Sequence, residues 1–208
     1  MASEKRERLL DRLKNAVKFN RATKESEISK KWFAAQLQDF AAYSQKRSPD
    51  DVFNEKKRIA GVSKQPDSLI GQMVMYYYSP KHADTLPFYD TFPLGIIVGP
   101  VGNDKIASLN LHYLPPVLRA SFLDNLLDVL TTENITKQSR FDITYAMLKG
   151  VSKYKYYAPC YKHYLTTHIK SNVKIISPDY WIRSVFLDTA QFKKASKGEV
   201  YKWSRSKL

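Results

Sequence analysis

The stretch LNLHYLPPVL, residues 109–118, places a histidine between apolar residues and directly before two prolines. His112 with Asp90 or Asp84 would form a general acid–base pair if their strands were neighbours. Asp84, Asp90 and Asp104 could also gather a divalent cation for phosphodiester cleavage. These aspartates stand in segments typical of loops and turns, and no serine elbow, glycine-rich phosphate loop or HxH set accompanies them. We therefore expect His112 to be a hydrogen-bonded residue of the fold in a chain that is not an enzyme. A metal-dependent nuclease is the enzymatic alternative.

The other residues with metal-binding or nucleophilic chemistry form weaker patterns. Cys160 is the one cysteine of the chain and follows an Ala-Pro pair, so we expect a packed thiol in a protein without intrachain disulfides. His163 and His168 are five residues apart, which is not the spacing of two zinc ligands on one helix face. The sequence therefore predicts neither a bound metal nor a cofactor.

Lysines and tyrosines alternate along residues 149–174, a stretch that contains no arginine. Lysine attracts phosphate, and tyrosine offers a stacking face or a hydroxyl donor to a nucleic-acid backbone. Without arginine, bidentate reading of bases is not expected. We predict sequence-independent backbone contacts by eight residues: Lys153, Lys155, Tyr156, Tyr157, Lys162, Tyr164, Lys170 and Lys174. Two alternatives stay open. The tyrosines could instead pack the core while the lysines only solvate the surface, or the tyrosines could anchor a protein partner.

The charge of the chain is strongly positive and unevenly spread. The formal net charge is +14 over 208 residues, which favours a polyanionic partner over a purely structural use of basic residues. Residues 1–70 hold 16 Lys or Arg against 10 Asp or Glu, residues 71–130 hold 3 against 5, and residues 131–208 hold 15 against 5. A nearly neutral middle is thus flanked by two basic segments. The charged N-terminus and the lack of a long apolar run predict a soluble protein made in the cytoplasm, without a membrane partner.

The first basic segment has the spacing of helices. Residues 9–19 repeat apolar side chains every three to four positions, and a second helix is expected over residues 25–44. A short helix over residues 50–59 and a linker over residues 61–71 should follow. We therefore assign residues 1–66 to a basic helical N-terminal arm.

The middle of the chain changes from helical to strand-like composition. Residues 71–80, 94–100 and 105–114 are rich in β-forming residues, and residues 101–104 suit a hairpin turn. The imperfect alternation of the last segment suggests a β-bulge near Ser108. Three short strands in this order predict a small antiparallel sheet.

The elements that follow should cover this sheet. Pro115 and Pro116 are expected to end the last strand and to start a helix with a wide apolar face. A helix over residues 141–148, a strand over residues 173–177 and another helix come next. The predicted fold class is α+β: a small antiparallel β-barrel or curled sheet, SH3-like, with packed helices and a helical N-terminal extension. The core domain, residues 67–208, ends in a basic tail.

The central motifs resemble a family of virion proteins from T-even-like tailed bacteriophages, labelled DNA end protectors or head-completion proteins. The resemblance covers roughly residues 73–203. It rests on these segments: MYYY with PK at 75–81, LP at 86–87, YD at 89–90, FPL at 92–94, LNLHYLPP at 109–116, KHYL at 162–165, and FKKAS at 192–196. The chain departs from the family pattern at Phe88, where the family has tyrosine, at the missing glycine before LNLHY, and at Trp203, which lies beyond the usual place of the C-terminal tryptophan.

The resemblance implies a structural protein of the virion, assembled in the host cytoplasm. Its partners would be other phage virion proteins and the end of the packaged double-stranded DNA, at the head–tail junction or DNA end. The alternatives are a tail or baseplate assembly protein without DNA contact, and a metal-dependent nuclease of packaging. The resemblance assigns nine motif residues to folding or docking: Tyr89, Asp90, Phe92, Pro93, Asn110, His112, Tyr113, Pro115 and Arg119.

Overall fold

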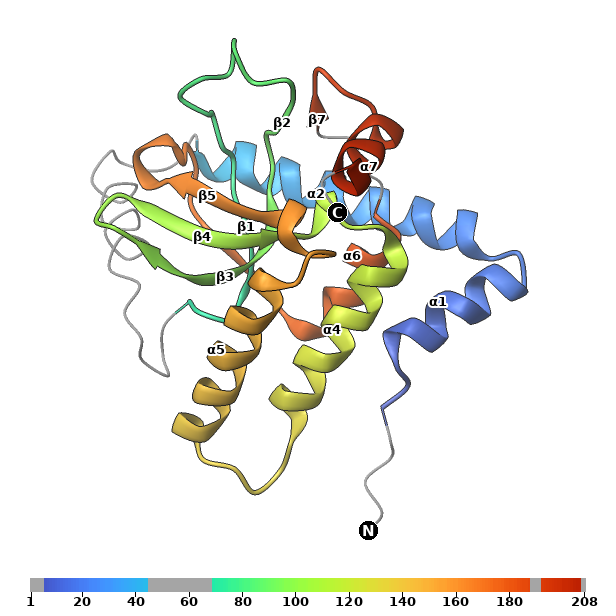
Figure 1. Ribbon diagram of the computed structural model, residues 1–208. Helices are drawn as coiled ribbons and strands as arrows, with labels where there is room; N and C mark the ends of the chain where they lie inside the picture. Colours follow the sequence, from blue (N-terminus) through green and yellow to red (C-terminus); the bar gives the residue numbers. More distant parts are fainter. Residues whose placement is uncertain (1–5, 45–68, 188–191, 207–208) are drawn as a thin grey trace.

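The computed structural model describes residues 6–44, 69–187 and 192–206. Its centre is a five-stranded antiparallel sheet with the order β5-β4-β3-β1-β6 (Figure 1). The strands are β1 (Met73–Met75), β3 (Leu94–Val101), β4 (Lys105–Asn110), β5 (Tyr161–Leu165) and β6 (Lys174–Ile176). A separate two-stranded sheet pairs β2 (Tyr89–Asp90) with β7 (Phe192–Lys193). The α+β class and the antiparallel sheet are confirmed. The sheet is not closed, so the predicted barrel is wrong, and the SH3-like topology stays a prediction.

The β3–β4 hairpin forms where the sequence predicts it. Its turn spans residues 102–104, and Gly102 has a φ of +62° that a residue without Cβ adopts readily. The register of the hairpin shifts between Ile97 and Gly99, opposite Ser108 and Ala107. The predicted irregularity near Ser108 is therefore confirmed, and the extra residue lies on β3.

The segment LNLHYLPPVL is a joint between strand and helix and is not a strand throughout. Strand β4 ends at Asn110, and the 3-10 helix η1 (Leu111–Tyr113) follows. The side chain of Asn110 accepts a hydrogen bond from the backbone N–H of His112 at 2.9 Å, which caps this turn. The prediction of a strand up to residue 114 was wrong because this cap competes with extended structure.

Helices lie behind the sheet, below it and on one side of it (Figure 1). They are α1 (Leu9–Lys18), α2 (Ala22–Ser44), α4 (Pro116–Thr131), α5 (Lys137–Lys153), α6 (Trp181–Phe186) and α7 (Lys197–Ser206). The predicted helix over residues 141–148 is thus part of a longer one. The predicted helix over residues 50–59 and the arm boundary at residue 66 lie outside the described residues. Side chains of α1 and α2 join the same buried core as the sheet, for example Leu13 and Phe33.

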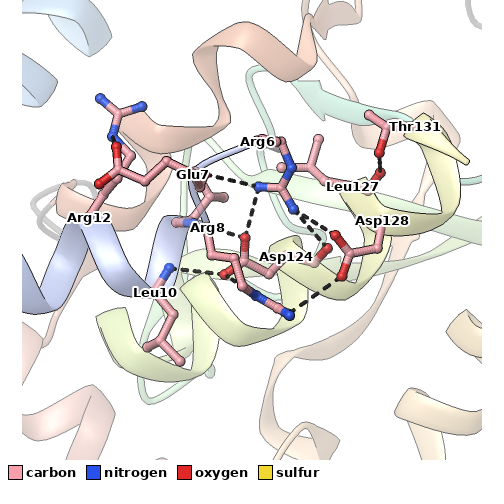
Figure 2. Close-up of polar contacts among 10 residues, drawn as sticks. Arg6, Glu7, Arg8, Leu10, Arg12, Asp124, Leu127, Asp128 and Thr131 are labelled. Atoms are coloured by element: carbon pink, nitrogen blue, oxygen red, sulfur yellow. Dashed lines mark hydrogen bonds and ion pairs between the residues drawn. The ribbon is translucent and has the colours of Figure 1, made fainter. Parts of the chain in front are cut away.

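One carboxylate ties α1 to the core (Figure 2). Asp124 of α4 is fully buried and accepts hydrogen bonds from the backbone N–H groups of Leu9 at 2.8 Å and Leu10 at 2.9 Å, and from Arg6 Nη1 at 2.9 Å. Asp124 therefore caps the first turn of a helix more than 100 residues away in sequence. Arg6 Nη2 also reaches Asp128, at 2.9 Å.

The electrostatic balance at Asp124 favours the ionised form. Burial alone would raise the pKa of this carboxyl, but the N–H groups of Leu10 and Leu9 and the guanidinium of Arg6 outweigh burial and lower the pKa below its usual range. A group with a lowered folded-state pKa stabilises the fold above its unfolded value, near 4, and loses this contribution as pH falls.

We expect Asp124→Asn to lower the free energy of unfolding by about 2 kcal/mol at neutral pH, because an amide nitrogen then faces a buried N–H donor. The difference from the wild type should shrink as pH falls below about 4, first because the carboxyl of the unfolded chain becomes protonated and then, at lower pH, because folded Asp124 does too. Chemical denaturation at several pH values measures both effects. The matched control is Asp128→Asn, one helical turn away, whose half-exposed ion pairs should change stability by less than about 1 kcal/mol. Equal losses for the two variants would contradict the capping role.

Candidate nucleic-acid interface

A buried polar network joins β2 to β4, η1 and β5. Asp90 Oδ2 lies 2.7 Å from His112 Nδ1 and accepts a hydrogen bond from Asn110 Nδ2 at 2.9 Å. The other oxygen of Asp90 accepts from the backbone N–H of Phe92 at 3.0 Å. Asn110 Nδ2 also donates to the hydroxyl of Tyr164 at 2.9 Å. Since an ionised carboxylate only accepts, we assign the proton of the imidazole to Nδ1.

The network has the properties of a structural brace. His112 and Asp90 are 1% and 4% exposed, and the ring of Phe33 from α2 contacts the imidazole edge-on at 5.8 Å. His112 Nε2 has no hydrogen-bond partner among the described residues. The predicted hydrogen-bonded role of His112 is therefore what the structure shows. Within the described residues, no group of three or more His, Cys, Asp or Glu side chains is placed to hold a metal ion.

An aromatic pocket of about 320 Å³ opens beside this network. Its buried floor is formed by three tyrosines and one carboxylate: Tyr78, Tyr113, Tyr164 and Asp90. Its half-buried or exposed rim includes Phe88, Lys162, His163 and Trp203. These residues come from the segment between β1 and β2, from β2, from η1, from β5 and from α7, and these elements are spread over the sequence. An apolar pocket with a few polar groups is the usual form of a small-ligand site.

Lys162 is the cationic group of the pocket. Its Nζ lies 4.0 Å from the ring centre of Tyr113 and 5.2 Å from that of Trp203. Burial lowers the pKa of Lys162 to about 8. The ammonium is thus poorly hydrated and held against two aromatic faces, where an anionic group would find a partner.

Edge-to-face ring contacts hold the aromatic wall in place. The rings of Phe88 and Trp203 are 5.2 Å apart, and those of Tyr113 and Phe192 are 4.8 Å apart. The β2–β7 pairing brings Phe192 to this wall, and Lys194 then donates through Nζ to three backbone oxygens of the loop over residues 83–86. The C-terminal segment therefore completes the pocket.

Four of the eight predicted contact residues lie around the end of α5 and the short 3-10 helix η2 (Ala158–Cys160). Lys153 and Lys155 are exposed, and Tyr156 is 46% exposed with the Lys155 ammonium 5.2 Å from its ring centre. Tyr157 is half-buried, and its ring lies 5.8 Å from that of Phe122. The first three thus present lysine and tyrosine to solvent, while Tyr157 mainly packs.

The other four predicted contact residues have different surroundings. Lys162 lines the pocket, and the buried Tyr164 belongs to its floor, so these two side chains could meet DNA only through the pocket. Lys170 is exposed and donates to the backbone oxygen of Thr167. Lys174 lies on β6, at the opposite edge of the sheet from β5, and pairs with Asp39 at 2.8 Å. The eight residues therefore do not form one continuous row, and their contact with DNA stays a prediction.

Arg119 is the motif residue with the most hydrogen bonds. Its side chain is fully buried, and Nε donates to the backbone oxygen of Leu114 at 2.7 Å. Nη1 donates to the oxygens of Ser184 at 2.8 Å and Leu187 at 2.6 Å, and Nη2 donates to the hydroxyl of Tyr201 at 2.7 Å. The hydrogen bonds of the Arg119 side chain thus connect the end of α6 and one side of α7 to the start of α4.

The remaining motif residues and Cys160 also contribute to the fold. Pro115 is the N-cap of α4, and Tyr89 pairs with β7. Phe92, followed by Pro93, places its ring 5.1 Å from that of Tyr77. Cys160 is completely buried, and burial raises the pKa of its thiol to about 12, so the prediction of a packed cysteine is confirmed.

The pocket was missed at the sequence level. Phe192 appeared only within the FKKAS segment, and Phe88 and Trp203 appeared only as departures from the family pattern. No local spacing links them, because the β2–β7 pairing and α7 bring them together. The one available signal was the combination of aromatic residues with lysine in the tail.

Comparison with known families gives a match over nearly the whole chain. A family model described as phage T4 terminal DNA protecting protein matches residues 4–207. Neither the curated proteins nor the solved structures contain a match to the chain. Within the parts of the chain that the structure describes, no helix is both long and apolar enough to cross a lipid bilayer.

Proposed function

Since the chain belongs to the phage T4 terminal DNA protecting protein family, we propose that it binds the ends of linear phage DNA and shields them by occupying the terminus. It acts through contacts with the DNA backbone and performs no reaction of its own. In the virion, it lies at the head–tail junction or the DNA end and docks to neighbouring virion proteins.

The observation that carries this proposal is the acid-free stretch over residues 143–178. This stretch contains six lysines and no Asp or Glu. Lys153 and Lys155 are exposed beside the exposed rings of Tyr154 and Tyr156. Phosphate contacts by lysine are independent of base sequence, and tyrosine adds a stacking face or a hydroxyl donor. Such a surface suits a protein that must hold a terminus regardless of its sequence.

The C-terminal region adds positive charge next to the pocket. Residues 193–206 hold five Lys or Arg and one Glu. The side chain of this Glu199 accepts a hydrogen bond from the backbone N–H of Ser196 at 2.6 Å, at the start of α7. Lys202 and Arg205 are exposed on the same helix as Trp203. A DNA strand that reaches the pocket would therefore pass cationic side chains.

Docking to virion proteins has separate support on α1 and in the turn after it. Val17 and Phe19 are 60% and 56% exposed, so two large apolar side chains close together in the sequence face solvent. The cationic groups of Lys18 and Arg21 lie 5.5 and 5.2 Å from the ring centre of Phe19. Phenylalanine and arginine are both enriched at protein interfaces, whereas lysine is depleted there, so Phe19 and Arg21 carry this support.

The test compares a linear duplex with a covalently closed circular duplex of the same sequence. We expect tighter binding to the linear form and protection of its ends against an added exonuclease. If about six phosphates are contacted, the affinity should fall about a thousandfold between 50 and 200 mM salt. Absence of DNA binding, or of a salt dependence, would favour the assembly protein without DNA contact. Equal affinity for circle and linear duplex would contradict end binding.

The double substitution Lys153→Gln/Lys155→Gln tests the proposed backbone surface. It should weaken binding to every DNA sequence alike and reduce the slope of log affinity against log salt by about 2. The matched control is Lys14→Gln, since Lys14 is exposed on α1, away from α5 (Figure 1). An unchanged slope in the double variant would exclude this surface from DNA contact.

A further inference from the structure

Binding to a DNA end requires a feature that distinguishes the last nucleotide from those before it. Backbone phosphates carry the same charge along the whole duplex, so lysines alone attract the middle of a duplex as strongly as its end. Inside the duplex, each base is paired and stacked and cannot enter a pocket without being extruded. A terminal base loses little on leaving the stack, because it has one neighbour instead of two.

We propose that the aromatic pocket between the segment before β2, η1, β5 and α7 takes one unpaired terminal nucleotide of a DNA strand. The base lies against the aromatic wall, and the phosphate contacts Lys162. This inference rests on the proposed end binding and deepens it by naming the group that is recognised. Capture of the last nucleotide would also remove the substrate that an exonuclease needs.

The size and lining of the pocket suit this ligand. Its volume of about 320 Å³ lies at the lower end of the range for small-ligand sites, which fits a single nucleotide better than a stretch of DNA. The half-buried rings of Phe88 and Trp203 stand at the rim. Stacking on such rings tolerates every base, as protection of arbitrary termini requires.

The charges of the pocket set the orientation of the nucleotide. The carboxylate of Asp90 at the floor would repel a phosphate, although it already accepts from His112, Asn110 and Phe92. The ammonium of Lys162 stands higher, against Tyr113 and Trp203. The phosphate therefore belongs at the rim beside Lys162, near the basic side chains of α7, and the base points toward the tyrosines of the floor.

Lys162 is prepared for an anion in two ways. Burial lowers the pKa of its amine to about 8, because the charged form has lost much of its hydration. A ligand phosphate beside the amine would stabilise the charged form in place of that water. The described residues place no carboxylate within ion-pair distance of Lys162, whereas Lys174 already pairs with Asp39. Lys162 is thus the pocket cation that a ligand phosphate can reach.

The experiment uses the full chain and a short duplex with 2-aminopurine as a single unpaired terminal nucleotide. We expect the fluorescence of this probe to be quenched on binding, because the base stacks on protein rings. A second duplex, closed by a hairpin loop at both ends, has no terminal nucleotide and should bind about tenfold more weakly, which corresponds to the loss of one stacked base. A third duplex with 2-aminopurine in its interior should show no quenching.

Two pocket variants and one control localise the effect. The preference for the open end is the ratio of the affinities for the open and the hairpin-closed duplex. Trp203→Leu and Lys162→Gln should each reduce this ratio to less than about a third of its wild-type value and weaken the quenching. Lys155→Gln lies outside the pocket and should lower the affinity for open and closed duplexes equally. Circular dichroism of each variant shows whether it folds. If one pocket variant does not fold, the other pocket variant decides.

The possible outcomes separate this inference from end binding. If the wild-type protein prefers linear over circular DNA but leaves the terminal probe unquenched, end binding stands and the pocket inference is wrong. If quenching occurs but survives in folded Trp203→Leu and Lys162→Gln variants, the terminal base binds elsewhere and the inference is again wrong. If the wild-type protein does not bind DNA, both the proposed function and the inference fail.

Discussion

Replacing Arg119 by methionine is expected to lower the free energy of unfolding by about 4 kcal/mol and the melting temperature by about 10 °C. Methionine fills most of the space of the arginine stem but donates no hydrogen bond. The buried oxygens of Leu114, Ser184 and Leu187 would each lose a donor, and water cannot replace it at a fully buried position. Calorimetry or thermal denaturation followed by circular dichroism measures the effect.

Two further variants isolate the cause. Tyr201→Phe removes only the hydroxyl that accepts from Arg119 Nη2, so its loss should be about 1 kcal/mol. Arg205→Met replaces an exposed arginine on α7 and should change stability by less than about 0.5 kcal/mol. An Arg119→Met protein that melts within two degrees of the wild type would show that the hydrogen bonds of the buried guanidinium contribute little to stability.

Asp90→Asn is the second substitution with a large expected effect, a loss of about 3 kcal/mol. All three partners of the Asp90 carboxylate, on His112, Asn110 and Phe92, donate to it. An asparagine must turn its NH₂ group toward one side or the other, so either orientation places donor against donor. A change of imidazole tautomer relieves the clash with His112 but not that with Asn110. Chemical denaturation gives the stability change.

The same substitution separates the structural reading from the nuclease alternative. A catalytic Asp90–His112 pair would predict a folded Asp90→Asn protein of near wild-type stability that has lost DNA cleavage. A brace predicts the loss of stability and also a weaker terminal-nucleotide signal, because Asp90 lies at the floor of the pocket. The control is Asp84→Asn, which changes an exposed carboxylate in the loop before β2 and should be nearly neutral.

Local patterns in the sequence were sufficient for several elements. The apolar spacing of residues 9–19 gave the position of α1, and the hairpin turn over residues 102–104 and the start of α4 after Pro115 were also predicted. Each of these features depends on residues within a few positions of one another. Turn geometry, proline φ and helical periodicity act over that range, so one segment contains the information.

The surroundings of individual polar side chains were harder to predict. That His112 would be hydrogen-bonded followed from its place in an apolar stretch, but its pairing with Asp90 was one of two options. Tyr164 stood in a row of lysines and tyrosines that suggested an outer surface, and the structure buries it. Strand β5 has the sequence YKHYL, in which apolar and polar residues do not alternate clearly, so its inward face could not be identified.

The sequence by itself therefore determined most of the helices, the central hairpin, the strand-to-helix joint, the basic charge of both flanks and the resemblance to a phage family. Only the tertiary structure decided that Asp124 caps α1, that Arg119 fastens α6 and α7, and that Trp203 and Lys162 meet in one pocket. Each of these contacts joins segments tens to more than a hundred residues apart. The physical reason is that helix and turn preferences act within a few residues, whereas such contacts form only when the burial of the whole core brings distant segments together.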